Sequence, residues 1–452
     1  MGDDGTGLQE IDAGANACSV EWCPITGLES YMTCSTYCLK SAAAAAPGTP
    51  DDAAVKDEAV KADACMSQTR SGSVVLHKVG KVADLCLLPA SDPAPLTAGG
   101  WQTPAWCLKE AAKESLDGGV LDAKWCQRPL DSTGAGLLAC ATSTGRLVLF
   151  TLSAASSSTE RGSIEEAESA KLRHFCSSDA GDSLLLSLDW SGGGIADNAK
   201  IVVSQSDGAL AIWRLHPNGG APVQETGPWY AHTLRGGVPT EAWISFFRKG
   251  DDGSCGGQEA ASFVVSGADD ALMKGWDLRA GGGGDCGALP AFVCKTHEAG
   301  VTTGQWHPSL QHVFVSGSYD EKVRVWDARA LRDPVSTTPT GGGVWRLKWH
   351  PNPGRGNLLL AACMHAGIRV FDSGMGSSDP LVQESLSGSS EDGTLAEDGK
   401  GVVAKYTRHA SMAYGADWCR LPTLLQSKRA LVASCSFYDS LLCLWETPPL
   451  WS

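Results

Sequence analysis

The chain has 452 residues and a formal net charge of −15, with 51 acidic against 36 basic side chains. This excess of negative charge disfavours a general affinity for nucleic-acid phosphate. No run of 18 apolar residues occurs, so we expect no membrane-spanning helix. The length is too great for one small core but suits a closed ring of repeats, since seven units of about 40–45 residues take up about 300 residues.

The 17 cysteines are odd in number and scattered, and none forms a CxxC pair. We therefore expect buried free thiols in a reducing compartment rather than a zinc ribbon or a disulfide framework. The N-terminal stretch MGDDGTGLQE is acidic and lacks the apolar segment of a secretory signal. These features predict a cytoplasmic, monomeric protein that binds no nucleic acid and no membrane and has neither a metal site nor a cofactor.

A two-strand unit recurs along the chain with a fixed spacing. In its clearest copy, SGSYDEKVRVWDAR at 316–329, strands at 313–318 and 322–327 flank a tight turn, and the second strand alternates apolar and charged residues. Its WD dipeptide is a hallmark of propeller blades. In chain order, the same six-residue step joins Thr144 to Phe150, Asp207 to Trp213, Asp270 to Trp276, Asp320 to Trp326, His365 to Phe371 and Asp439 to Trp445.

A further strand ending in tryptophan precedes each copy, and an additional one at Trp22 implies a seventh unit. The other tryptophans of this kind are Trp125, Trp190, Trp243, Trp306, Trp349 and Trp418. A small sheet cannot bury both of its faces alone, so such sheets stack radially. The sequence therefore predicts an all-β, seven-bladed WD40 β-propeller over residues 1–452. We expect a strand at 8–12 to complete the last blade and close the ring.

The blades follow one another in chain order and leave several segments as insertions. Blade one begins at residue 17 and is expected to end near Trp106. Blade two spans 119–176 and blade three 184–232, and the later blades begin at 241, 301, 342 and 414. Loop insertions rich in Gly, Ser, Ala, Pro or acidic residues are expected near 41–71, 89–100, 153–170, 249–260, 280–288 and 373–401.

Candidate functional residues lie in the turns and in the loops that lead into each blade, because these share one face of a propeller. Aspartates in the turns normally brace the blade, and His297 is placed to hydrogen-bond Asp320. His365 replaces such an aspartate and is our first candidate base, because the unperturbed pKa of histidine is near neutrality. The alternative for His365 is a locally hydrogen-bonded turn residue. The sequence contains no GxSxG, HExxH, P-loop or strand-linked GxGxxG motif, so motifs alone indicate a binding ring.

Several short sequence segments are more specific for one family than the WD motif is. They are SVEWCP (19–24), LSLDWS (186–191), EAWISFF (241–247), GSYDEKVRVWDAR (317–329), GGVWRLKWHP (342–351), LLLAACMHAG (358–367), YGADWC (414–419) and SCSFYDSLLCLWE (434–446). Together they resemble the WD-repeat diphthine methylesterase family of diphthamide biosynthesis, in all seven units and in the same order. AACMHAG, YGADW and SCSFYD are not expected in a generic WD protein.

The resemblance implies hydrolysis of the methyl ester of methylated diphthine on elongation factor 2, giving diphthine and methanol. The chain would then be a carboxylic ester hydrolase, with modified elongation factor 2 as its partner. Ester hydrolysis needs an activated water or nucleophile, a base, and donors for the developing oxyanion. The candidate catalytic residues are His365 and, as second base, His409, with Tyr414 as a donor and Glu241 as a group that orients a histidine or a water.

The substrate implied by the resemblance also carries a trimethylammonium group, which aromatic faces can hold by cation–π attraction. The candidate substrate-binding residues are Trp243, Trp345, Arg346, Tyr438 and Asp439. Two other functions stay open, because a propeller fold does not fix function. The chain could be a non-catalytic WD40 adaptor, or it could be the substrate-recognition subunit of another enzyme.

Overall fold

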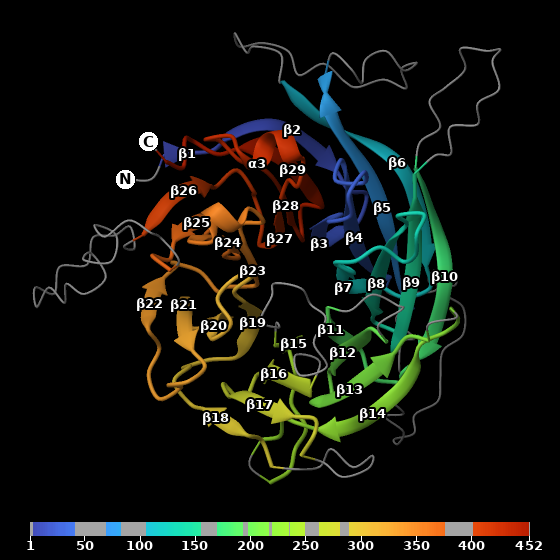
Figure 1. Ribbon diagram of the computed structural model, residues 1–452, viewed down its shortest axis with the longest axis vertical. Helices are drawn as coiled ribbons and strands as arrows, with labels where there is room; N and C mark the ends of the chain where they lie inside the picture. Colours follow the sequence, from blue (N-terminus) through green and yellow to red (C-terminus); the bar gives the residue numbers. More distant parts are fainter. Residues whose placement is uncertain are drawn as a thin grey trace, which may run out of the picture.

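The computed structural model describes residues 3–40, 69–82, 105–154, 170–192, 198–216, 219–234, 236–248, 262–280, 289–375 and 401–451. Over these residues the chain is almost entirely β-structure, and seven sheets stand around a central axis like the blades of a wheel (Figure 1). The sequence prediction of a seven-bladed WD40 propeller is confirmed. No helix in this part of the chain is both long and apolar enough to cross a membrane.

Within each blade, successive strands pair antiparallel from the axis outward. Blade one holds β3 (Asn16–Trp22), β4 (Tyr31–Lys40), β5 (Thr69–Lys81) and β6 (Trp106–Leu116). Blade two holds β7 (Val120–Trp125), β8 (Gly136–Thr142), β9 (Arg146–Ser153) and β10 (Lys171–Asp179). Blade three holds β11 (Leu185–Trp190), β12 (Lys200–Gln205), β13 (Ala209–Arg214) and β14 (Val223–Tyr230).

The second half of the ring repeats this arrangement with shorter outer strands. Blade four holds β15 (Ile244–Phe247), β16 (Phe263–Gly267), β17 (Met273–Asp277) and β18 (Phe292–Cys294). Blade five holds β19 (Val301–Trp306), β20 (Val313–Ser318), β21 (Lys322–Asp327) and β22 (Ser336–Pro339). Blade six holds β23 (Arg346–Trp349), β24 (Leu358–Ala362), β25 (Ile368–Asp372) and β26 (Val402–Tyr406). A 3-10 turn, Pro353–Arg355, lies between β23 and β24.

The N-terminal strand closes the ring, as the sequence predicts. Blade seven has three strands of its own, β27 (Ala413–Trp418), β28 (Leu431–Ser436) and β29 (Leu441–Glu446), with a short helix, α3 (Pro422–Leu425), between the first two. Its outer strand is β2 (Thr6–Asp12), which pairs antiparallel with β29. The two-residue β1 (Asp3–Asp4) adds in parallel to β26 of blade six, so the two ends of the chain lie close together (Figure 1).

The tryptophan that ends most inner strands is a core residue. Trp22, Trp125, Trp190 and Trp418 are each at most 2% exposed and lie between neighbouring blades. Such large apolar surfaces are what hold stacked sheets together. Blade four departs from the pattern, because its inner strand begins only after Trp243.

In blade four, Phe247 ends the inner strand and is 0% exposed, so it occupies the core position. Trp243 is thereby released from the core and stays half-buried at the start of the strand. The expectation that Trp243 ends an inner strand is wrong, because Trp243 precedes β15. The consequence is an indole available at the end of the channel.

The predicted bracing of the turns is present, but its details differ between blades. In blade four, His232 lies 2.9 Å from Asp270 through Nδ1 and 2.8 Å from Ser266 through Nε2, and the Trp276 indole donates to the same serine. In blade five, His297 reaches Ser316 but not Asp320. Asp320 instead forms a 2.8 Å ion pair with Arg324, so the expected His297–Asp320 bond is wrong.

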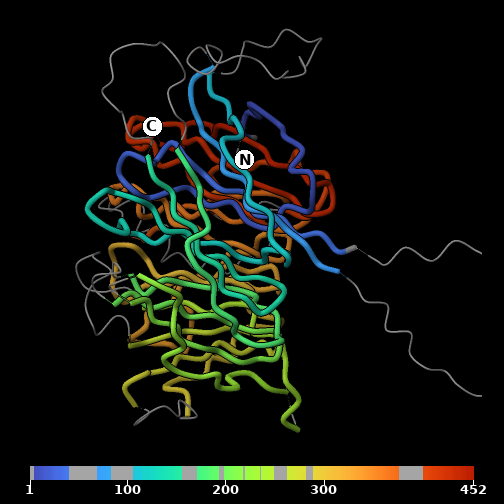
Figure 2. The backbone as a smooth tube through the Cα atoms, turned by 90° about the vertical axis from the view of Figure 1, so that its right-hand side faces the viewer, coloured from blue at the N-terminus to red at the C-terminus, as the bar shows by residue number. Residues whose placement is uncertain are grey.

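Blade one extends further than the sequence predicts. Its outer strand β6 begins at Trp106 and runs to Leu116, so the expected end near Trp106 is wrong. Together with β5 it projects beyond the ring (Figures 1 and 2). The insertions expected near 89–100 and 249–260 lie outside the described residues, as does the greater part of those near 41–71, 153–170, 280–288 and 373–401.

The cysteines of the described segments form no disulfide bond, and Cys140, Cys363 and Cys435 are fully buried within strands or at their ends. Burial raises the pKa of the Cys363 thiol to about 12, so it stays protonated and unreactive. In the same segments, no group of three or more histidine, cysteine or carboxylate side chains is arranged to hold a metal ion.

Candidate active site

A cavity of about 220 Å³ lies at the axis of the ring, at the end where the turns and the loops into the blades meet. Its lining comes from the beginnings of the inner strands and from the turn after β28. Four sequence candidates line it: Trp243, Trp345, Arg346 and Tyr414. Residues far apart in the sequence therefore converge because each occupies an equivalent position in its blade.

Aromatic side chains form a continuous row along this cavity, which we call the aromatic row: Trp243, Tyr319, Trp345, Tyr414 and Phe437. Trp345 stacks on Tyr414 with ring centroids 4.7 Å apart, and it meets Trp243 at 5.7 Å. Tyr319 lies 6.2 Å from Trp243 and 6.1 Å from Trp345. Phe437 continues the row 5.3 Å from Tyr414. These spacings are typical of interacting aromatic pairs.

Carboxylates stand beside one end of the aromatic row. The indole of Trp243 lies 3.4 Å from a carboxylate oxygen of Asp269, and Glu241 is exposed nearby. Burial raises the pKa of Tyr319, and the charges of Asp269 and Glu241 raise it further, so its hydroxyl keeps its proton. The row therefore combines electron-rich ring faces with a negative potential, which is the combination that attracts an organic cation.

An ion pair crosses the channel at the inner end of the cavity. Arg346, at the start of β23 in blade six, lies 3.0 Å from Asp122 on β7 in blade two. Arg346 is 7% exposed and Asp122 is 0% exposed. Burial lowers the pKa of Arg346, but the carboxylates of Asp122 and Glu21 outweigh it and raise that pKa. Burial raises the pKa of Asp122, and the cations around it outweigh this and hold it low.

A second buried pair lies next to the first. Lys348 on β23 bonds to Glu21 on β3, so blade six is tied across the axis to blade one as well as to blade two. Burial raises the pKa of Glu21 in spite of its lysine partner. Members of the two pairs line the cavity at the other end of the channel, and Arg346 lines both cavities.

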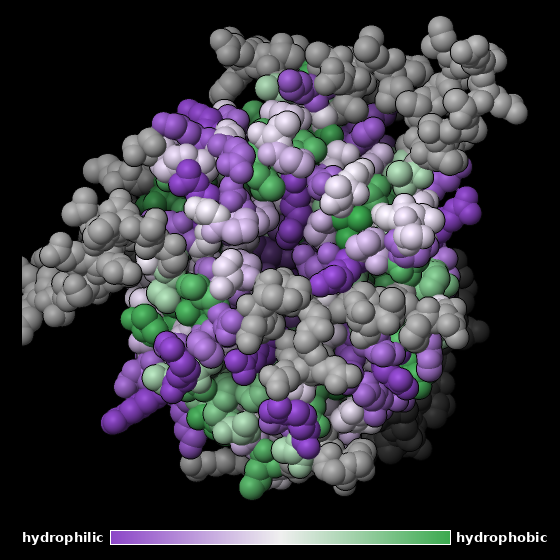
Figure 3. Space-filling view, in the orientation of Figure 1, coloured by the Kyte–Doolittle hydropathy of each residue, from purple (hydrophilic) through white to green (hydrophobic). Residues whose placement is uncertain are grey.

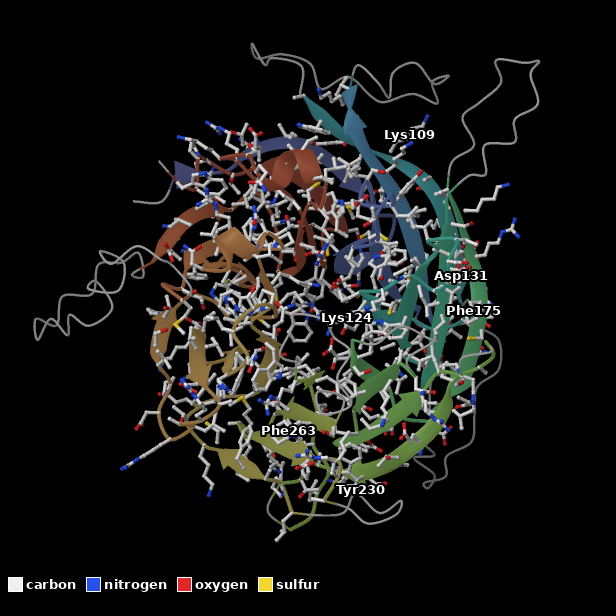
Figure 4. All side chains as sticks on the ribbon, in the orientation of Figure 1. Lys109, Lys124, Asp131, Phe175, Tyr230 and Phe263 are labelled. Atoms are coloured by element: carbon white, nitrogen blue, oxygen red, sulfur yellow. The ribbon has the colours of Figure 1, made fainter. Side chains whose placement is uncertain are left out.

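The other end of the channel holds a separate cavity of about 240 Å³. It shares Arg346 with the first cavity and is otherwise lined by residues further along the inner strands, among them Glu21, Lys124 and Lys348. Figure 3 shows a hollow with hydrophilic residues around it at the centre of one face of the ring. Figure 4 places Lys124 near the axis, whereas Lys109 and Tyr230 lie at the outer edge.

Two of the remaining candidates lie around the first cavity rather than in its lining. Tyr438 is 68% exposed and packs against Phe437 with ring centroids 5.0 Å apart. Glu241 precedes β15 and is close enough to Tyr319 to influence its pKa. Tyr438 therefore lies at the Phe437 end of the aromatic row, and Glu241 lies near its other end, at Tyr319.

His409 and Asp439 belong to a bracing network in blade seven. His409 lies 2.7 Å from Ser436 through Nδ1 and 2.7 Å from Ser434 through Nε2. Ser436 donates to Asp439, and the Trp445 indole donates to Ser434. Burial lowers the pKa of His409 to about 4, so the ring is neutral, and both of its nitrogens are engaged. This geometry is that of a bracing residue.

His365 stands apart from the residues that converge. It lies in the turn after β24, and its side chain is exposed. It does not line the cavity, and it has no hydrogen bond or ion pair with another residue of the described segments.

Sequence reasoning missed three residues that shape the site: Tyr319, Phe437 and Asp122. Tyr319 and Phe437 follow β20 and β28 directly, at equivalent positions of their blades. Aligning the repeats by their turns therefore places Tyr319 and Phe437 at the same position of their blades. No repeat pattern points to Asp122, because its importance comes from its contact with Arg346 on the opposite side of the ring.

Comparison with known proteins now adds to the geometry. A scan against family models finds no match. The chain is 30% identical over 414 residues to "Diphthine methyltransferase" of Homo sapiens, covering 91% of this chain and 74% of that protein. The chain belongs to the diphthine methyltransferase family. The mouse member is 30% identical over 456 residues and the Dictyostelium discoideum homolog 31% over 344 residues, covering 98% and 75% of this chain and 77% and 79% of those proteins.

The family membership confirms the resemblance found in the sequence. The solved structure titled "Crystal Structure of Mitotic Checkpoint Complex" contains a chain that matches this family member with a TM-score of 0.54 and 12% identity, covering 98% of this chain and 94% of that one. At that identity the likeness concerns the fold alone.

Proposed function

We propose that the chain hydrolyses the methyl ester of methylated diphthine on elongation factor 2, a step of diphthamide biosynthesis. One observation supports this proposal above the others: a cavity that combines an aromatic row, adjacent carboxylates and a buried arginine, in a chain whose relatives are named for diphthine. The name of those relatives indicates an enzyme that changes the methylation of diphthine. That the methyl ester is the bond that reacts is our proposal.

The aromatic row suits the trimethylammonium group of this substrate. Trp243, Tyr319 and Trp345 meet at one end of the cavity, and Asp269 and Glu241 supply negative charge beside them. A quaternary ammonium cannot donate hydrogen bonds, so aromatic faces and carboxylates are the groups that recognise it. Tyr438 and Phe437 extend the row outward, where the protein that carries the modified histidine would lie.

The reaction requires attack of water on the ester carbonyl, release of methoxide, and transfer of a proton to form methanol. We assign Glu241 as the base that takes the proton from water, with exposed His365 on the same face as the alternative base. The Tyr414 hydroxyl and the Arg346 guanidinium donate to the oxyanion that develops. His409 keeps its bracing role, because both of its ring nitrogens are already bonded.

Methanol release by the purified chain tests the proposal. Elongation factor 2 carrying methylated diphthine is incubated with the chain, methanol is measured, and mass spectrometry follows the modified peptide. We expect release of methanol and loss of one methyl group. Gain of a methyl group from a supplied methyl donor would instead support the transfer reaction in the relatives' name.

The same assay separates the other functions. No methanol release under any condition would favour an adaptor ring, and release only with another protein of the pathway would favour a recognition subunit. Replacing Tyr438 by alanine removes an exposed aromatic at the cavity and is expected to raise KM. Tyr230→Ala removes an equally exposed tyrosine, 64% accessible, from the outer strand of blade three and serves as the matched control.

A further inference from the structure

The cross-channel pair of Arg346 and Asp122 forms the floor of the aromatic cavity. Arg346 lines the cavity directly, whereas Asp122 is fully buried beneath it and does not. Each comes from an inner strand, and the two blades face one another across the axis. The floor is therefore held by rigid strands and not by a loop.

Asp122 is fixed in place from several sides. One oxygen accepts from the backbone N–H of Leu188, and the other accepts from its neighbour Ala123. Lys124 lies 3.5 Å from the carboxylate. A carboxylate held in this way imposes one orientation on the arginine that pairs with it.

The pair leaves hydrogen-bond donors of Arg346 for a ligand. A guanidinium has five N–H donors. In the described part of the chain its ion-pair partner is Asp122, 3.0 Å from Nη2. Arg346 lines the cavity, and the remaining donors of its guanidinium suit the planar oxygens of a carboxyl group.

Charge balance favours the same arrangement. An unpaired arginine at the floor would repel a quaternary ammonium bound a few ångströms away on the aromatic row. Asp122 neutralises that charge without using up all of the donors. A ligand that carries both a quaternary ammonium and a carboxyl group therefore meets complementary groups at both ends of the cavity.

We propose that Asp122 is a positioning residue that holds Arg346 as the carboxyl-recognition group of the cavity, for the ester of the substrate and for the carboxylate of the product. The identity of the physiological ligand rests on the proposed function, but the binding test does not. Glycine betaine carries a trimethylammonium and a carboxylate, and choline carries a hydroxyl in place of the carboxylate. Binding of each to the full chain is followed by tryptophan fluorescence and by calorimetry.

We expect the wild-type chain to bind betaine about ten-fold or more tightly than choline, which corresponds to one charge-assisted hydrogen-bond interaction. In Asp122→Asn we expect this preference to fall to near unity, because Arg346 loses its fixed orientation. Choline affinity should fall as well, because the charge of Arg346 is no longer neutralised. Glu21→Gln is the matched control, because it makes the same acid-to-amide change in the neighbouring cross-channel pair, away from the aromatic row. It should keep the preference.

Equal affinity of the wild type for betaine and choline would overturn the inference, as would an unchanged preference in Asp122→Asn or an equal loss in Glu21→Gln. If Asp122→Asn does not fold, Arg346→Lys takes its place: it keeps the charge but loses the planar fork, and it should lose the preference. A retained preference in Arg346→Lys would also contradict us. Betaine selectivity without methanol release would remove only the proposed function, and methanol release without selectivity would remove only this inference.

Discussion

Replacing His409 by alanine distinguishes a bracing residue from a catalytic base. The ring bonds to Ser434 and Ser436 at 2.7 Å each, and those serines contact Trp445 and Asp439 in turn. Loss of the ring removes one hydrogen-bond partner from each of the two buried hydroxyls, at about 1–3 kcal/mol for each group. We therefore expect His409→Ala to lower the free energy of unfolding by roughly 2–5 kcal/mol.

Urea unfolding measures that loss, and methanol release measures activity on the same preparation under conditions where the variant is folded. A bracing role predicts that kcat of the folded variant stays close to that of the wild type. A general base would contribute about 10²–10⁴-fold to the rate. The exposed turn residue His365 provides the comparison, because its replacement by alanine should change the unfolding free energy by at most about 0.5 kcal/mol.

His409 is not a bracing residue if His409→Ala unfolds like the wild type yet loses activity a hundred-fold. Such a result would mean that the bonds to the two serines contribute little and that the ring reaches the substrate. It would also return His409 to the role that the sequence analysis gave it.

Three further predictions concern the cavity, acid stability and ring closure. Trp345→Ala should raise KM about ten-fold with little change in kcat, since it removes a cation–π partner worth up to about 2 kcal/mol; a loss confined to kcat would contradict this. Burial lowers the pKa of His297 and of His350 to about 4 from 6.5, so the unfolded chain binds more protons between these values. Stability should be complete above pH 6.5 and fall by the order of 3 kcal/mol for each histidine as the pH drops to 4, which urea titrations at several pH values will measure; a flat profile would refute it. Deleting Thr6–Asp12 removes the outer strand of blade seven and should abolish the cooperative thermal transition; an unchanged transition would show that closure does not depend on it.

The ring itself could be predicted because its signals are local and repeated. The six-residue step from the turn to the tryptophan reflects a hairpin that every blade must form, and the core tryptophans reflect burial between blades. Blade one lacks such a hairpin signal. Its outer strand, WCLKEAAKESL, has a composition that favours helix, and it forms β6 because the edge of β5 is available for pairing.

The site could be predicted only in part, for a related reason. Trp345 and Tyr414 converge because each stands at the start of an inner strand, which the repeat reveals. The repeat placed Trp243 at the end of such a strand, whereas it precedes β15. The bonds of His409 to two serines depend on side-chain rotamers in a folded blade, which spacing does not reveal. The pairing of Arg346 with Asp122 joins opposite sides of the ring and depends on closure of the whole propeller.

The two ion pairs that span the channel have a consequence for the order of substrate binding and product release. Asp122–Arg346 and Glu21–Lys348 span the axis, and a separate cavity lies at each end of the channel. On the proposed function, a substrate that enters beside the aromatic row would leave on the same side of the ring, and so would the methanol. If the proposed function holds, elongation factor 2 bound on that side would have to dissociate before the methanol could leave, so each binding event would process one modified side chain.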